Sequence, residues 1–148
     1  MSYTNLIYHI VFRTYRSMKS IDETHEKELY AYILGFVNNQ GGKLYRVGGM
    51  PDHIHLLVGI PPMIAISEFV RKLKFATSKW MKNSPSFPLF TGWGQSFAAF
   101  TFKKEDIPVV KHYIANQKEH HKQTTFAEEY KQFILDNGGS IDDFFLRD

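Results

Sequence analysis

The sequence contains no cysteine, which excludes disulfide bonds and metal sites built on thiolates. It also has no apolar run near the ~20 residues that a helix needs to cross a membrane. No basic segment followed by an apolar stretch stands at the start of the sequence, so no secretion signal is recognisable. These absences are compatible with a reducing compartment, and we expect a cytoplasmic protein that makes no membrane contact.

The composition is that of a folded domain. The 148 residues are 43% hydrophobic and 16% aromatic, well above the range of disordered chains. Because no repeat or low-complexity linker divides them, we expect one domain over 1–148, with a core at about 1–121 and a helical tail at about 122–148. The net charge of +3 favours a polyanionic partner only weakly.

Apolar residues recur with strand spacing in some segments and with helix spacing in others. We expect strands at 3–14, 44–47, 53–60 and 96–102, a turn at 48–52, and helices at 25–39, 67–80, 105–121 and 126–135. The order β-α-β-β-α-β is the split βαβ pattern. The sequence therefore predicts an α+β, ferredoxin-like fold, with an antiparallel sheet, helices on one face and a further helix on the C-terminal side.

Two histidines stand two residues apart in an apolar run, in Pro51-Asp52-His53-Ile54-His55-Leu56-Leu57-Val58. Alternate side chains of a strand point to the same face, so His53 and His55 would project together. A divalent metal that accepts both lone pairs is one interpretation. A pair of hydrogen-bonded strand histidines is the other, and the spacing alone does not decide between them.

A tyrosine and a glutamine follow one helical turn apart, in Tyr113-Ile114-Ala115-Asn116-Gln117. Residues four apart share a helix face, so Tyr113 and Gln117 would point the same way. Tyr113 could be an ordinary interface residue or a nucleophile. With His53 and His55, the Gln117 oxygen would complete a ligand set suited to Mn²⁺ or Mg²⁺.

Basic residues concentrate in the second predicted helix and after the first predicted strand. They are Arg71, Lys72, Lys74, Lys79 and Lys82 in the former and its exit, and Arg13, Arg16 and Lys19 in the latter. Such runs are commonly solvated faces, and they become phosphate-contacting surfaces when a nucleic acid is the partner.

Together these motifs resemble the HUH single-tyrosine transposases of the insertion-sequence-200-like group, which includes the REP-associated tyrosine transposases. The resemblance rests on Tyr8–Phe12, Pro51–Leu57, Ser67–Trp80 with Lys74, Trp93–Phe100 and Tyr113–Gln117. The His-x-His element is moderately specific alone and far more so with Tyr-x-x-x-Gln about 60 residues later. Ser96 and Phe97 depart from the usual Gly-Tyr of the family, and Phe75 follows Lys74 where glycine is common.

The resemblance implies a DNA transposase that cuts and rejoins single-stranded DNA with hairpin ends. By it, Tyr113 would attack, forming a 5′-phosphotyrosine, and His53, His55 and Gln117 would hold Mg²⁺ or Mn²⁺. It implies a homodimer with sites shared between subunits, acting in the cytoplasm near the nucleoid of a bacterium or archaeon.

The residues that would read the DNA are expected to include Arg13, Arg16 and Lys74. Two other functions stay open at this point. A non-catalytic nucleic-acid-binding module on the same fold would explain the basic and aromatic residues. A metal-dependent phosphoester hydrolase would explain the paired histidines.

Overall fold

Four antiparallel strands form one sheet, in the order β2-β3-β1-β4. The computed structural model describes residues 2–120 and, beyond them, only residues 128, 132 and 136. The strands are β1 (Ile7–Arg13), β2 (Lys43–Met50), β3 (His53–Gly59) and β4 (Ala98–Phe102). The two central strands, β1 and β3, carry the first strand motif and the two histidines side by side.

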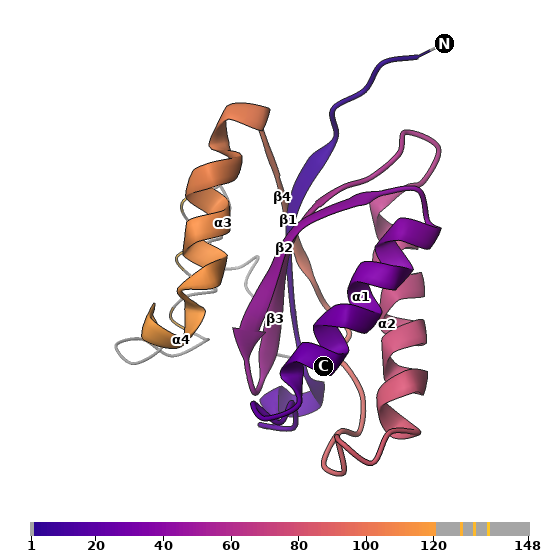
Figure 1. Cartoon of the computed structure of the whole chain (residues 1–148), viewed down its shortest axis with the longest axis vertical. Coiled ribbons are helices and arrows are strands. Elements are labelled where there is room, and N and C mark those ends of the chain that lie inside the picture. Colours follow the sequence, from indigo (N-terminus) through magenta and orange to yellow (C-terminus); the bar gives the residue numbers. More distant parts are fainter. Residues whose placement is uncertain (1, 121–127, 129–131, 133–135, 137–148) are drawn as a thin grey trace.

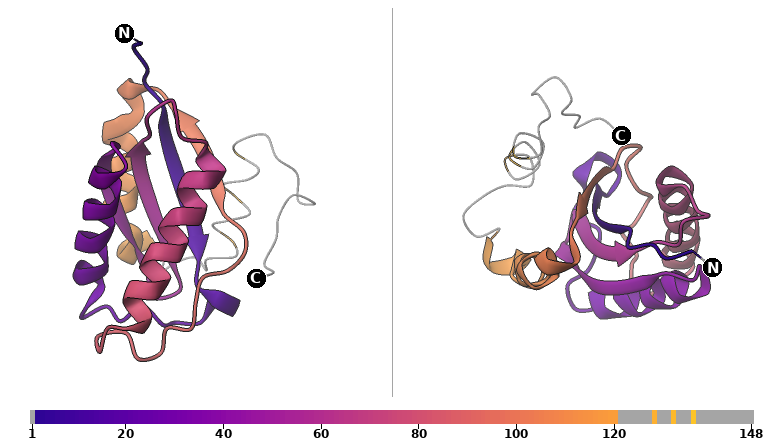
Figure 2. Two further views of the ribbon diagram at one scale, coloured as in Figure 1. Left: turned by 90° about the vertical axis from the view of Figure 1, so that its right-hand side faces the viewer. Right: turned by 90° about the horizontal axis from the view of Figure 1, so that it is seen from above.

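Helices cover both faces of this sheet (Figures 1 and 2). They are α1 (Glu26–Asn39), α2 (Ile66–Lys82), α3 (Ile107–Ala115) and α4 (Gln117–His120), with short 3-10 turns η1 (Tyr15–Ser17) and η2 (Lys104–Asp106). In Figure 1, α1 and α2 lie on one side of the strands, and α3 with α4 on the other. This confirms the predicted α+β, ferredoxin-like arrangement, with the helix that bears Tyr113 added on the opposite face.

Strand alternation divides the core in two. In β3, Ile54, Leu56 and Val58 are fully buried and belong to the large cluster beneath α1 and α2. The opposite face forms a smaller apolar cluster beneath α3, made by Ile7, Leu57, Val110 and Ile114. The histidines of β3 share the face of Leu57, so they lie on the α3 side of the sheet.

Helix α3 comes very close to the sheet at Gly48 of β2. A Cβ atom at this position would lie 2.8 Å from the carbonyl oxygen of Ile114 and 3.0 Å from its Cγ2 atom. Since glycine lacks that atom, the helix that carries Tyr113 can pack directly on the β2 backbone. Gly48 was expected in a turn, but β2 continues through Met50, so only Pro51 and Asp52 form the turn.

Three predicted boundaries were wrong in detail. The first strand begins at Ile7 and not at Tyr3, and the last begins at Ala98 and not at Ser96. The helix predicted to run to about His121 is interrupted at Asn116, whose φ of −96° and ψ of 17° are not helical. Residues 2–6 and 96–97 form no regular element and Asn116 is a turn, so the apolar periodicity alone extended each element too far.

The described helices include none with the length and apolar character of a membrane span. The helix expected at 126–135 and the tail expected at about 122–148 lie outside the described residues, apart from residues 128, 132 and 136. The prediction of a single domain over 1–148 stays a prediction.

Candidate active site

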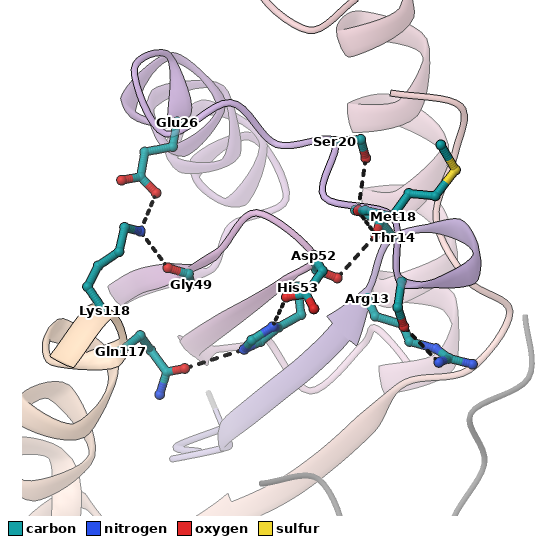
Figure 3. A network of polar contacts seen from close by, with 11 residues as sticks. Arg13, Thr14, Met18, Ser20, Glu26, Gly49, Asp52, His53, Gln117 and Lys118 are labelled. Atoms are coloured by element: carbon teal, nitrogen blue, oxygen red, sulfur yellow. Dashed lines mark hydrogen bonds and ion pairs between the residues drawn. The ribbon is translucent and has the colours of Figure 1, made fainter. Parts of the chain in front are cut away.

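His53 is held on its two ring nitrogens by different partners. Its Nδ1 atom lies 2.7 Å from Oδ1 of Asp52, the preceding residue in the β2–β3 turn. A carboxylate only accepts hydrogen bonds, so Nδ1 carries the proton and donates it. Nε2 of the neutral ring is then an acceptor, and it lies 3.4 Å from Oε1 of Gln117 (Figure 3). Asp52 therefore fixes the tautomer that turns a lone pair toward Gln117.

His55 is held in the same way by a third histidine, His9 of β1. His9 Nε2 lies 2.9 Å from His55 Nδ1, and both side chains are buried. The two rings are 5.1 Å apart between centroids, and the rings of His53 and His55 are also 5.1 Å apart. Three imidazoles thus form a contiguous row on the α3 face of the two central strands.

Tyr113 projects from α3 onto this row. Its ring centroid lies 5.8 Å from that of His55 and 6.1 Å from that of His9, with an edge-on geometry in both cases. The side chain is half-buried, at the border of the small cluster that Leu57 and Ile114 form. The helix therefore brings the phenol to the histidines of the same chain.

Gln117 reaches the site because the helix breaks just before it. Helix α3 ends at Ala115, and the Asn116 N–H donates to the carbonyls of His112 and Tyr113. The chain then restarts as α4 at Gln117, whose side chain is only 1% exposed. The expectation that Tyr113 and Gln117 share one continuous helix was wrong, yet both side chains lie at the histidine row.

Lys118 fastens α4 to the rest of the molecule. Its Nζ atom donates to Oε2 of Glu26 on α1 at 2.8 Å and to the Gly49 carbonyl on β2 at 2.7 Å (Figure 3). The Tyr30 hydroxyl donates to the same Glu26 oxygen at 2.9 Å. Burial, and then the negative charge of Glu26, raises the pKa of Tyr30. We call Lys118, Glu26 and Gly49 the α4 clamp.

The donor set fits a divalent metal. Two buried imidazoles have their Nδ1 atoms engaged by Asp52 and His9, which leaves the Nε2 lone pairs for a cation. Gln117 adds an amide oxygen that faces the acceptor atom of His53. Among the described residues, His, Cys, Asp and Glu side chains alone supply no group of three that could hold a metal, and His9 and Asp52 are used to hold the two ligand rings. Gln117 would therefore be the third protein ligand of a metal held by His53 and His55.

Comparison with known proteins identifies the family of the chain. Residues 2–117 match the family described as "Transposase IS200 like". The chain belongs to this family. Its general activity is therefore that of a transposase, an enzyme that cuts and rejoins DNA, and membership of the family suggests a divalent metal cofactor in general.

Solved structures show the same fold as this IS200-like transposase. One, from Deinococcus radiodurans R1 and assigned as a transposase, is 26% identical with a TM-score of 0.61, over 78% of this chain and 93% of its own. Another is a REP-associated tyrosine transposase bound to a REP hairpin, 12% identical with a TM-score of 0.61, over 98% and 88%. At that identity the second likeness concerns the fold alone. No curated protein matches the chain.

The three residues expected to contact DNA have different surroundings in this IS200-like transposase. Arg13 is directly opposite His53 in the β1–β3 register, is 5% exposed, and donates from Nη1 to Ser17 Oγ at 2.9 Å. Arg16 is exposed in η1, with a left-handed φ of 54° and its guanidinium 5.1 Å from the Tyr15 ring centroid. Neither contact tests a role in DNA binding.

Lys74 has a structural position between α2 and the segment before β4. Its Nζ atom donates to the carbonyls of Gly94 at 2.8 Å and Ser96 at 2.9 Å. It also lies 5.3 Å from the ring centroid of Phe12. Burial lowers the pKa of Lys74 to about 8. Its contacts tie α2 to the chain leading into β4.

Sequence reasoning did not assign a function to His9 or Lys118. His9 lies 46 residues before His55 in the sequence, and only the pairing of β1 with β3 brings the two side chains together. Lys118 is one of two lysines on the helix predicted at 105–121, and nothing in the sequence sets it apart. The one available signal for His9 was its strand parity with Val11 and Arg13, which places it on the face opposite Ile10 and Phe12.

Proposed function

We propose that this transposase cleaves and rejoins single-stranded DNA through a covalent 5′-phosphotyrosine at Tyr113. One observation supports the proposal most strongly. Residues from separate parts of the sequence converge on one buried row, with Tyr113 5.8 Å from His55 in ring centroids and Gln117 3.4 Å from His53. Neither a binding module nor a small-molecule hydrolase needs a tyrosine at this place.

In the cleavage step, the Tyr113 hydroxyl oxygen would attack the scissile phosphorus. A bond forms between that oxygen and phosphorus, and the bond between phosphorus and the 3′ oxygen breaks. The phenolic proton is released to solvent, and the departing 3′ oxygen takes up a proton, so the step is balanced. The products are a phosphotyrosine joined to the 5′ side of the break and a free 3′ hydroxyl.

A divalent metal, Mg²⁺ or Mn²⁺, held by His53, His55 and Gln117 would neutralise phosphate charge and orient the phosphorus for in-line attack. The chain's own contribution is positional. Asp52 and His9 keep the two ligand rings in one tautomer, and the α4 clamp keeps Gln117 at the site. These contacts would hold the reacting groups in place before DNA arrives.

Rejoining follows from the covalent intermediate. The phosphotyrosine is a phosphodiester like the bond that was broken, so a 3′ hydroxyl can attack it and release Tyr113 without an external energy source. A hydrolase that used water directly would lose this capacity. Strand transfer is therefore the outcome that a tyrosine nucleophile favours.

We further propose that hairpin ends of a mobile element mark the DNA to be cut. The similar fold of a REP-associated tyrosine transposase bound to a REP hairpin supports this. The predicted homodimer with shared sites, and activity in the cytoplasm near the nucleoid, belong to the same proposal. In the single chain, Tyr113 and Gln117 already lie beside its own histidines.

The deciding experiment is a covalent-adduct assay. End-labelled single-stranded oligonucleotides from the flanks of the gene, including any hairpin, are incubated with protein and Mn²⁺ or Mg²⁺. We expect a metal-dependent protein–DNA band on a denaturing gel, with the linkage mapped to Tyr113 by mass spectrometry. Tyr113→Phe and His53→Ala should abolish it.

Tyr3→Phe serves as the matched control, because Tyr3 is 90% exposed and is not one of the residues of the histidine row. It should form the adduct at the rate of the unmodified protein. Tight hairpin binding without an adduct would support the binding module instead. Turnover of small phosphoesters that survives Tyr113→Phe would support the hydrolase.

A further inference from the structure

Phe75 is a large apolar side chain exposed in the middle of α2. It is 70% exposed, although α2 buries Phe69, Val70 and Leu73 on its other side. At this position the resemblance implied glycine, and the structure shows that the added ring takes no part in the core. Core packing therefore does not explain a phenylalanine at this position, and the exposed ring can contact another molecule.

Two grooves meet at Phe75. One is lined by Tyr32, Trp80 and Pro85 among others, and the second by Trp93, Ser78 and Lys82 among others. Phe75 and Lys79 line both, so they form the ridge between the grooves. We call the ridge and its two grooves the Phe75 surface.

The charge of the Phe75 surface has one sign. Lys79 and Lys82 are exposed, and no aspartate or glutamate lines either groove. Elsewhere on α2, Glu68 forms ion pairs with Arg71 at 2.6 Å and Lys72 at 3.7 Å. Within the described part of the chain, no such acid pairs with Lys79 or Lys82, so both ammonium groups are available to an anion.

An exposed ring beside available ammonium groups fits single-stranded nucleic acid. Every base has a flat face that stacks on an aromatic side chain, and the backbone supplies the phosphates. Phe75, Lys79 and Lys82 occupy positions i, i+4 and i+7, which lie along one face of a helix. A hydrophobic segment of a protein would use the ring and the grooves but not the lysines.

We propose that the Phe75 surface binds single-stranded DNA, with an unpaired base stacked on Phe75 and neighbouring phosphates at Lys79 and Lys82. This rests on the proposed function only in taking single-stranded DNA as the substrate. Helix α2 and helix α3 cover opposite faces of the sheet (Figure 2). The Phe75 surface is therefore an anchoring site, separate from the row of histidines where Tyr113 lies.

The test is DNA affinity, measured by fluorescence anisotropy on the full chain without metal, so that no cleavage interferes. The probe is a single-stranded oligonucleotide from the gene flank that carries 2-aminopurine next to the hairpin. Phe75→Ala should weaken binding about tenfold and restore the 2-aminopurine fluorescence that stacking quenches. Phe75→Tyr, which keeps the ring, should bind like the unmodified protein.

Met63→Ala is the control, because Met63 is 85% exposed and lines neither groove. Lys79→Gln and Lys82→Gln should each reduce the slope of log affinity against log salt by about 0.7, as expected for one phosphate contact on a single strand. Phe75 is exposed, so its replacement leaves the core intact, and circular dichroism verifies the fold of each variant.

Equal DNA affinity of Phe75→Ala and the unmodified protein would overturn the proposal, and would leave a protein partner as the alternative occupant. Loss of affinity in Phe75→Tyr as large as in Phe75→Ala would also overturn it, since the ring would not be the cause. Failure of the proposed function is a separate result. In that case no adduct forms at Tyr113, while DNA binding still depends on the ring at Phe75.

Discussion

His9 Nε2 and His55 Nδ1 lie 2.9 Å apart, so one neutral imidazole donates a hydrogen bond to the other in the buried space beneath α3. The direction follows from the chemistry that we propose for His55. A ring that offers its Nε2 lone pair to a metal carries its proton on Nδ1, and His9 then accepts that proton's hydrogen bond. His9 is thus a positioning residue for His55, as Asp52 is for His53.

Replacement of His9 should therefore weaken metal binding without removing a ligand. We expect His9→Ala to reduce the affinity for Mn²⁺ about 10- to 100-fold, the usual effect of losing a partner that orients a ligand. Titration calorimetry or Mn²⁺ electron paramagnetic resonance on the protein without DNA measures this directly. His9→Gln, which can restore an acceptor oxygen, should recover part of the loss.

His25→Ala is the matched control, because the His25 ring pairs with Glu28 at 2.6 Å and is not one of the residues proposed to hold or orient the metal. Its Mn²⁺ affinity should be unchanged. Equal affinity in His9→Ala and the unmodified protein would show that His55 keeps its orientation without His9.

The α4 clamp makes a second prediction. Lys118→Met removes both the Glu26 and the Gly49 contacts, so α4 should no longer hold Gln117 at the histidine row. We expect slower adduct formation and faster amide exchange in α4. The loss of stability should stay below about 1 kcal/mol, because Lys118 is partly exposed.

Glu26→Gln separates charge from geometry in the clamp. The amide oxygen of glutamine still accepts from Lys118, so adduct formation should fall less than in Lys118→Met. Adduct rates and exchange in α4 that match those of the unmodified protein in both variants would contradict a role of the clamp in holding Gln117.

The sequence predicted what depends on local periodicity. The alternation in β3 placed His53 and His55 on one face and Ile54 and Leu56 on the other, and the buried clusters agree. The order of elements likewise predicted the sheet, because split βαβ connections leave few topologies. The site's two strand histidines were therefore accessible to sequence reasoning.

What depends on register or on a helix end was not predictable. In the β1–β3 pairing Val11 is opposite His55 and His9 is opposite Leu57, so His9 meets His55 as its diagonal neighbour. Periodicity does not specify that register. The position of Gln117 depends on the break at Asn116, which no apolar pattern marks. Contacts across the sheet and the end of α3 therefore required the structure.

The close approach of α3 to β2 gives a third prediction. A methyl group at Gly48 would meet the Ile114 carbonyl, so Gly48→Ala should displace α3 and with it Tyr113. We expect a loss of about 1–3 kcal/mol in the free energy of unfolding, measured with urea, and slower formation of the adduct.

Gly35→Ala is the control, since a Cβ in α1 there meets nothing within 4 Å. It should be neutral or stabilising by up to about 1 kcal/mol. Equal stability of Gly48→Ala and Gly35→Ala would mean that α3 can shift at no cost.

Lys74 should make the stability of the protein depend on pH in the alkaline range. Burial lowers its pKa to about 8 in the folded chain, whereas a lysine in the unfolded chain titrates near its ordinary value of about 10.4. Between these values the unfolded chain binds more protons than the folded one, so the free energy of unfolding rises with pH. Below pH 8 both states hold the proton, and the contribution of Lys74 is constant.

The comparison that isolates this effect is with Lys74→Met, which removes the titrating group and the contacts to Gly94 and Ser96. Loss of those contacts lowers the free energy of unfolding by an amount that is the same at every pH, so only the titration of Lys74 makes the difference between the two proteins change with pH. From pH 8 to about 10.4, the unmodified protein should gain stability relative to Lys74→Met, by less than the roughly 3 kcal/mol of the full shift, because solvent screens this partly exposed ammonium group. Urea unfolding at pH 7, 8, 9 and 10 measures the difference. A difference that stays flat over this range, or falls, would mean that the two carbonyl acceptors keep Lys74 charged at least as strongly as water does.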